Sequence, residues 1–175
     1  MTRRSTRFNL LARTLHWLMA GMILVMLFIG VGMMSTVSPL YRELFGWHRT
    51  IGILVLVLVA VRLINRLMRG APPLPADLPS WQKWAANGPH ILLYALMFAM
   101  PLLALAALSA AAYPVLIFGH LQLAPITHQD AELYAVLRAT HRRLAYLLFA
   151  VWLAHFAAAL FHRLIRRDAV LRSMT

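Results

Sequence analysis

Hydrophobic residues in this chain gather in four long stretches, separated by segments that carry most of the charged residues. The stretches run from about His16 to Met34, Trp47 to Met68, Pro89 to Ser109 and His141 to Leu164. Each is about as long as the roughly 20 helical residues that cross a bilayer core. The pattern predicts one domain, residues 1–175, folded as an all-α integral membrane four-helix bundle.

The segments between the later stretches are predicted to be loops. Gly70 to Pro75 is too rich in proline to continue a helix, and Asp77 to Asn87 is expected to extend this loop. Tyr113 to Thr127 is expected to be irregular, since it contains two further prolines.

The fourth helix is expected to begin before its apolar stretch. Helical patterning resumes at His128, and Thr127 is a suitable N-cap because its hydroxyl can accept a hydrogen bond from a backbone N–H of the first turn. The helix is then expected to run unbroken to Arg167.

Composition supports lipid as the solvent of this chain. Hydrophobic residues make up 62% of it and charged residues 13%, whereas about a quarter of the residues of a soluble domain are charged. The net charge of +12 does not indicate nucleic acid, because the basic residues flank the apolar stretches and form no single block. The absence of cysteine excludes disulfides, iron–sulfur ligation and covalent c-type haem attachment.

Orientation follows from the distribution of Lys and Arg over the two sides of the predicted bundle. Five basic residues fall on one side: Arg42, Arg49, Arg138, Arg142 and Arg143. Twelve fall on the other: Arg3, Arg4, Arg7, Arg13, Arg62, Arg66, Arg69, Lys83, Arg163, Arg166, Arg167 and Arg172. Because basic loops stay in the cytoplasm, we expect both termini to be cytoplasmic.

Histidines carry the candidate chemistry, since ionisable side chains at membrane depth are costly and usually functional. His141 and His155 are fourteen residues apart, so they share one helix face and lie about 21 Å apart along the axis. Their depths match those of His48 and His16, respectively. Two cross-helix pairs are predicted, His48 with His141 and His16 with His155, an arrangement that suits two haems with two axial nitrogens each.

Residues at matching depths are candidates for haem contacts. Gly30 would leave room for a flat ring at the outer pair, and Arg62 would neutralise a propionate at the inner pair. Arg49, Arg142 and Arg143 are candidates for the same role at the outer pair. His90, at the inner start of the third stretch, could reach a propionate or a quinone, or could simply cap its helix.

Other uses of the histidines fit less well. Zinc prefers four ligands in one tetrahedron, whereas the predicted pairs lie about 20 Å apart. A proton relay would usually include carboxylates within the spans, and the spans contain none. A haem-free transporter or structural protein remains a third class, which predicts a colourless preparation.

These residues together resemble the prokaryotic cytochrome b561 family. The fragments that carry the resemblance extend in order over nearly the whole chain: Leu15-His16-Trp17, Trp47 to Gly52, Val61-Arg62-Leu63, Arg69 to Pro75, Thr140-His141, and Leu153-Ala154-His155 followed by His162. The resemblance implies two b haems per chain with His16, His48, His141 and His155 as axial ligands. Gly52 joins Gly30, Arg49, Arg62 and Arg142 as an expected haem contact.

The resemblance also implies an activity. It places a ubiquinone site near the cytoplasmic haem, with His162, one heptad after the inner ligand, as its expected contact. His90 is a second candidate from its position at the inner end of the third stretch. Superoxide oxidation is one activity that the family implies, and the outer arginines would either attract such an anion or bind the haem propionates. The alternative is a non-catalytic di-haem anchor subunit, which relays electrons from a periplasmic hydrogenase or formate dehydrogenase to quinone.

Overall fold

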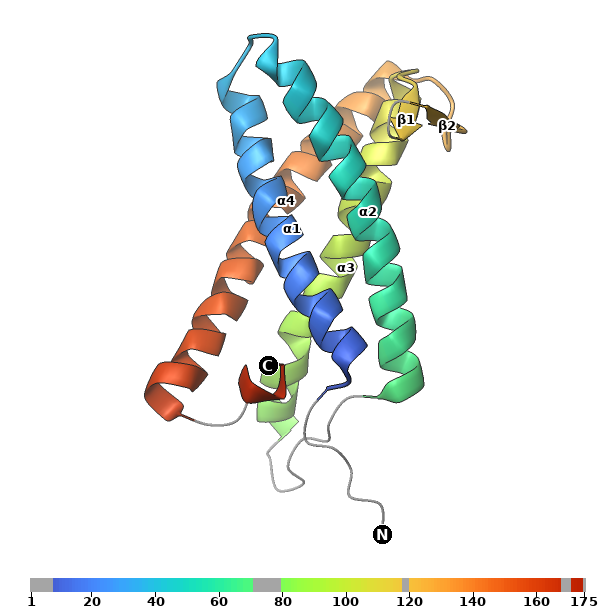
Figure 1. The fold of residues 1–175 in the computed structure, drawn as a ribbon. Coiled ribbons are helices and arrows are strands. Elements are labelled where there is room, and N and C mark those ends of the chain that lie inside the picture. The colour runs from blue at the N-terminus through green and yellow to red at the C-terminus, as the bar shows by residue number, and fades with distance from the viewer. Residues whose placement is uncertain (1–7, 71–79, 118–119, 168–170, 175) are drawn as a thin grey trace.

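The structure, a computed structural model, describes residues 8–70, 80–117, 120–167 and 171–174. Long helices dominate the described chain (Figure 1): α1 (Leu10–Ser35), α2 (Leu40–Arg69), α3 (Ser80–Ala110) and α4 (Ala131–Phe161). All four are long and apolar enough to cross a membrane. The predicted all-α membrane bundle is therefore confirmed.

Local signals in the sequence explain where the first two helices begin and end. The side chain of Asn9 caps α1 by accepting a hydrogen bond from the backbone N–H of Ala12 across 2.7 Å. Helix α2 ends at Gly70, whose φ of 72° favours glycine and whose N–H donates to the carbonyl of Arg66. The rest of the proline-rich segment, residues 71–79, lies outside the described residues.

Helix α3 begins earlier than the sequence predicts. It starts at Ser80, so residues 80–87, which were expected to be part of a loop, are helical. Pro89 and Pro101 both lie inside this helix. Proline removes one helical hydrogen bond, which breaks most soluble helices, but membrane helices tolerate it because neighbouring groups satisfy the freed carbonyl. Pro89 was therefore a poor marker of the helix start.

The connection from α3 to α4 contains a small hairpin that the sequence did not predict. Strands β1 (Val115–Ile117) and β2 (Leu121–Leu123) pair antiparallel, with Val115 opposite Leu123. After the hairpin, the hydroxyl of Ser109 accepts a hydrogen bond from the backbone N–H of Ile126 across 3.0 Å. The expected irregular segment is thus partly regular and is fastened to the end of α3.

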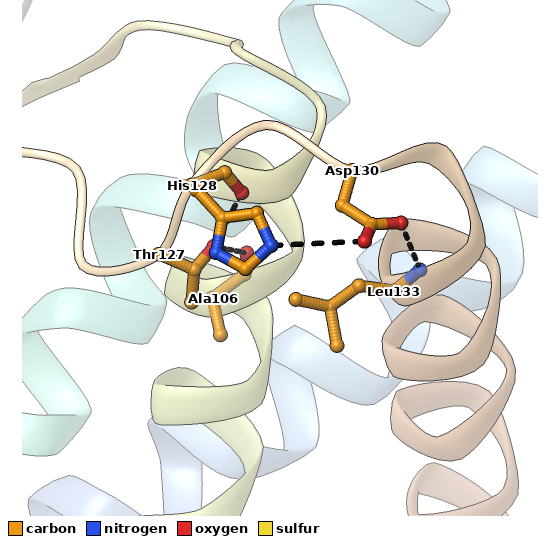
Figure 2. A network of polar contacts seen from close by, with 5 residues as sticks. All are labelled: Ala106, Thr127, His128, Asp130 and Leu133. Atoms are coloured by element: carbon orange, nitrogen blue, oxygen red, sulfur yellow. Dashed lines mark hydrogen bonds and ion pairs between the residues drawn. The ribbon is translucent and has the colours of Figure 1, made fainter.

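The N-cap of α4 is Asp130, and the expectation of Thr127 was wrong (Figure 2). The carboxylate of Asp130 accepts from the backbone N–H of Leu133 at 2.9 Å and lies 3.7 Å from Nε2 of His128. Thr127 instead donates towards the carbonyls of Ala106 and His128. An ionised oxygen is the stronger acceptor at a helix N-terminus, which explains why the helix begins after Asp130.

At its other end α4 continues without a break to Arg166, close to the expected end at Arg167, but its last turn changes type. At Phe161 the α-helix gives way to a π-helical turn, η1 (His162–Arg166), which Arg167 ends with a φ of 53°. A short 3-10 turn, η2 (Leu171–Ser173), then packs back on the start of α1. The N–H of Phe8 donates to Ser173 at 3.1 Å, and the indole of Trp17 donates to the carbonyl of Met174 at 2.9 Å.

The helices pack as two hairpins, α1 on α2 and α3 on α4, which meet where α2 contacts α3. Both hairpin connections lie at one end of the molecule (Figure 1), here called the outer end, and the opposite end is called the inner end. These names follow the orientation predicted from Lys and Arg. Of the twelve basic residues expected inside, Arg3, Arg4 and Arg7 lie outside the described residues.

The buried core lies at mid-height and comes from all four helices. Its members are Met19, Ile23, Val59, Leu96, Met97 and Leu148. Many other large apolar side chains are exposed, for example Phe28 at 70% and Val31 at 65%. An apolar surface of this extent indicates that lipid surrounds the bundle.

Candidate functional site

The outer pair of histidines lies across the bundle as the sequence predicts. His48 comes from α2 and His141 from α4, and their ring centroids are 6.2 Å apart, with the ring planes inclined by 69°. Both side chains are partly buried. Helices from opposite hairpins therefore present two imidazoles to each other at the outer end.

A backbone carbonyl of α3 orients His141. Its Nδ1 lies 3.1 Å from the carbonyl oxygen of Met100. Because a carbonyl only accepts, Nδ1 carries the hydrogen and donates it, which leaves Nε2 with a free lone pair. A metal-binding histidine commonly has this arrangement, in which one nitrogen is held by the protein while the other faces the metal.

A cavity of about 1670 Å³ surrounds the outer pair and reaches several residues predicted to contact haem. His48, His141, Gly30, Gly52, Arg49 and Arg142 all line it. A Cβ atom added to Gly30 would have Cε1 of His48 as its nearest neighbour, at 3.9 Å, and one added to Gly52 would lie 3.5 Å from Met26. Because neither glycine has a side chain, space is left in the cavity near His48, which suits a flat ring.

Two buried polar atoms at this cavity have no hydrogen-bond partner among the described residues: Nδ1 of His48 and Nε of Arg49. The guanidinium of Arg49 also lies 5.8 Å from the centroid of the Phe45 ring, and its Nη1 is 3.5 Å from the carbonyl of Pro114. Buried polar atoms usually have hydrogen-bond partners, so these two nitrogens indicate that a polar or ionised group of a ligand binds here.

The inner pair has the same separation as the outer one. The ring centroids of His16, from α1, and His155, from α4, are 6.2 Å apart, with the planes inclined by 78°. A third imidazole, His90 of α3, lies 5.3 Å from that of His155. The predicted quinone contact His90 is thus brought directly against the inner pair.

Arg62 reaches the inner pair from α2, as the sequence predicts. Its Nη2 lies 3.3 Å from Nδ1 of His16, and its Nε donates to the hydroxyl of Tyr94 at 3.0 Å. A guanidinium has only donors, so His16 accepts this hydrogen bond. Tyr94 was not predicted as a site residue, although it is the only tyrosine of the expected third span and lies one helical turn after His90.

His162 lies at the inner end of α4. It follows His155 by seven residues, at the point where α4 passes into the π-helical turn, and its ring lies 6.1 Å from that of Phe161. A role of His162 in binding quinone remains a prediction.

The separation within each pair is suitable for a bis-imidazole metal centre. A metal–imidazole bond of about 2 Å, with the nitrogen about 1.1 Å from its ring centre, places two opposed ring centroids about 6.2 Å apart. The rings of each pair lie edge to face, with their planes inclined by 69° at the outer pair and 78° at the inner pair. The spacing of each pair therefore fits two imidazoles that bind one iron, and at the inner pair His16 would bind through Nε2 once its Nδ1 no longer accepts from Arg62.

A metal ion that binds without a porphyrin needs a group of ligating side chains. Within the described ranges, no group of three or more His, Cys, Asp or Glu side chains could hold a metal ion. Haem needs only one or two axial ligands from the protein, since the porphyrin supplies the other four. Histidines arranged in pairs are thus suited to haem rather than to zinc.

A membrane-spanning helical bundle with imidazoles paired across it at two depths is the class of protein that the fold and the site define. Comparison with known proteins then identifies the family. The family model described as "Prokaryotic cytochrome b561" matches residues 7–175. The chain belongs to this family of membrane electron-transfer proteins that bind haem b.

Curated relatives of similar length match nearly the whole chain. Cytochrome b561 homolog 1 of Escherichia coli (strain K12) is 31% identical over 178 residues, which cover 96% of each chain. Cytochrome b561 homolog 2 of the same strain is 30% identical and covers 99% of this chain and 93% of its own length. The protein named "Probable superoxide oxidase CybB" from Yersinia pestis is 28% identical over 96% of this chain and 95% of its own.

Proposed function

We propose that this protein is a di-haem oxidoreductase of the bacterial inner membrane, which takes electrons from superoxide at the outer end and delivers them to ubiquinone at the inner end. The observation that carries the proposal is the repetition of one geometry at two depths. Imidazoles from facing helices lie 6.2 Å apart at each end, and the pairs share α4, where their members are fourteen residues apart.

Each pair would hold one haem b. His48 and His141 would bind the outer iron and His16 and His155 the inner iron, while Gly30 and Gly52 leave room for the outer ring. Arg49 and Arg142 would bind outer propionates, and Arg62 would place its positive charge beside the inner haem. When bound, such haems supply one-electron transfer without binding oxygen, since two histidines leave the iron no open position.

The charge of the outer end supports an anionic donor. Arg42 and Arg138 line the outer cavity and are not among the arginines proposed to bind propionates. Basic side chains at the mouth of a cavity raise the local concentration of a small anion. The Yersinia pestis relative named as a probable superoxide oxidase supports the same donor.

The overall reaction balances with ubiquinone as the acceptor. Two superoxide anions each lose one electron and become dioxygen, while one quinone gains both electrons and two protons and becomes the quinol. The residues proposed to bind quinone are His162 and His90, whose imidazoles can donate hydrogen bonds to the quinone oxygens. His90 has the stronger structural support, because it lies 5.3 Å from His155.

The first experiment is a dithionite-reduced minus air-oxidised spectrum of the purified protein, with haem quantified per chain. A sharp b-type α-band at two haems per chain is expected. Protein that contains no haem after expression with an ample haem supply would overturn the proposal and leave the histidines a transporter or structural role.

The donor is tested separately, with a steady enzymatic source of superoxide and a soluble ubiquinone analogue. Quinol is expected to form at one molecule per two superoxide anions, and superoxide dismutase should abolish its formation. A haem-loaded protein that reduces quinone only when a periplasmic redox enzyme is added would instead be an anchor subunit.

A further inference from the structure

The guanidinium of Arg62 makes three hydrogen bonds, each with a different nitrogen. Its Nε donates to the hydroxyl of Tyr94 at 3.0 Å, its Nη1 to the carbonyl of Ala12 at 3.1 Å, and its Nη2 to Nδ1 of His16 at 3.3 Å. One side chain of α2 thereby connects α1 and α3. The geometry of the guanidinium is set by three acceptors that point at three different nitrogens.

Two of these contacts converge on one turn of α1. In an α-helix the backbone N–H of residue 16 donates to the carbonyl of residue 12, so Arg62 contacts both the ring of His16 and the turn that carries it. The third contact, with Tyr94, comes from the opposite side and fixes the guanidinium in place. Tyr94 is therefore the support of Arg62 on α3.

Among the residues that the structure describes, no carboxylate forms an ion pair with Arg62. Over the ranges that the structure describes, the single ion pair joins His128 to Asp130, at the outer end. A guanidinium stays protonated under all ordinary conditions, and a permanent cation at membrane depth is costly unless it has a function. Tyr94 stabilises it further, since the Arg62 guanidinium lies 5.9 Å from the centroid of the Tyr94 ring.

We infer that Tyr94 is a positioning residue that holds the guanidinium of Arg62 against His16, so that this fixed positive charge raises the reduction potential of the inner haem. The inference rests on the proposed function, in that it requires a haem at the inner pair. A ferrous haem has one positive charge fewer than a ferric haem, so a nearby cation stabilises the reduced form.

The hydrogen bond to Nδ1 of His16 need not persist for this effect. An imidazole that binds iron through Nε2 carries its proton on Nδ1, or else gives that proton up beside the guanidinium. In both cases Tyr94 and the carbonyl of Ala12 still hold Arg62 beside the ligand. The charge, not one particular bond, changes the potential.

The test compares two arginines on the same helix face. Arg66 lies one turn after Arg62, and its guanidinium is 5.8 Å from the centroid of the same Tyr94 ring, whereas the contact with His16 belongs to Arg62. Arg62→Met and Arg66→Met are titrated potentiometrically as purified holoprotein, with the two ferric haems resolved by electron paramagnetic resonance.

Arg62→Met is expected to lower the inner potential enough to change electron partition between the haems about tenfold, or about 59 mV for a one-electron couple. The outer potential should stay within error, and Arg66→Met should move neither by a comparable amount. An unchanged inner potential in Arg62→Met, or an equal fall in both haems, would overturn the inference.

Tyr94→Phe tests the positioning role, because it keeps the aromatic ring and removes only the hydroxyl that accepts from Arg62. Tyr94→Phe is expected to lower the potential of the inner haem, but by less than Arg62→Met does. Arg62→Lys keeps the positive charge, so its inner potential should lie between those of Arg62→Met and the wild type. If Tyr94→Phe leaves the inner potential unchanged, Tyr94 has no such role.

The controls also separate the two proposals. Wild-type protein without haem would refute the proposed function. Wild-type protein with two haems, together with inner potentials that do not change in the Arg62 and Tyr94 variants, would refute only this inference. If Arg62→Met lost its inner haem, Tyr94→Phe and Arg62→Lys would still report the potential.

Discussion

Nδ1 of His141 donates a hydrogen bond to the backbone carbonyl of Met100 across 3.1 Å, which links the outer pair to α3, a helix that contributes neither of its two imidazoles. The bond sets the tautomer of His141 and leaves the lone pair of Nε2 free, while the ring centroid of His48 lies 6.2 Å away. The outer pair is thus pre-organised by a main-chain group that no side-chain substitution removes.

His141→Ala is expected to remove the outer haem alone. The inner pair comes from other positions and lies about 21 Å away along α4, so the protein should retain about one haem per chain. His155→Ala should give the complementary half, with the outer haem retained. The haem content per chain and the electron paramagnetic resonance spectrum of the ferric haems show which haem each variant retains.

The matched control for His141→Ala is His128→Ala, a histidine at the same end whose side chain is 79% exposed. It should retain both haems. Loss of both haems from His141→Ala in folded protein would show that the sites are not independent and would contradict the two-site assignment.

Gly30 offers a steric test of the outer site. Its added Cβ would already lie 3.9 Å from His48, so Gly30→Leu would extend a side chain into the space beside the outer pair. We expect about one haem per chain, with the inner haem unaffected. Gly21→Leu, on the same helix, is the control, because a Cβ at Gly21 meets nothing within 4 Å and should leave two haems.

Much of this arrangement could be predicted from the sequence, because it depends on periodicity alone. The apolar stretches gave the four spans, and the fourteen-residue spacing of His141 and His155 gave two depths on one face. The contributions of α3 could not be predicted. Which of its groups face the pairs depends on the rotation of a helix that carries none of the four histidines, so Met100 and Tyr94 were missed.

Helix ends were predicted least well, for local reasons. The apolar pattern places the start of the third span at Pro89, but a proline inside a membrane helix is tolerated and α3 begins at Ser80. Thr127 has a suitable hydroxyl for an N-cap, but the stronger acceptor, Asp130, lies three residues later. The π-helical turn at His162 has no signal in the spacing of apolar residues.

The start of α4 should depend on acid pH through Asp130. The backbone N–H of Leu133 donates to the carboxylate and lowers the pKa of Asp130 below its ordinary value of 3.8, with His128 acting in the same direction. A lowered pKa means that the folded state favours the ionised form. The cap therefore contributes in full at pH values above 3.8, and its contribution is lost as the pH falls through the folded pKa.

Hydrogen exchange of the first-turn amides of α4 measures this effect. Asp130→Ala should speed exchange at neutral pH, and Asp130→Asn should largely preserve protection and remove the acid dependence below pH 3.8. Equal exchange in wild type and Asp130→Ala would show that the cap does not hold the helix start.

His162 provides the test of the quinone site that is independent of haem binding. It lies seven residues beyond His155, so His162→Leu should leave two haems and their spectra intact. Loss of one hydrogen bond to a quinone oxygen, worth about 1.4 kcal/mol, should raise the KM for the ubiquinone analogue about tenfold. His120→Leu, in the outer connection, serves as the control and should leave that KM unchanged. If His162→Leu reduced the quinone with wild-type kcat and KM, the residue would have no part in the site, and His90 would remain as the proposed quinone contact.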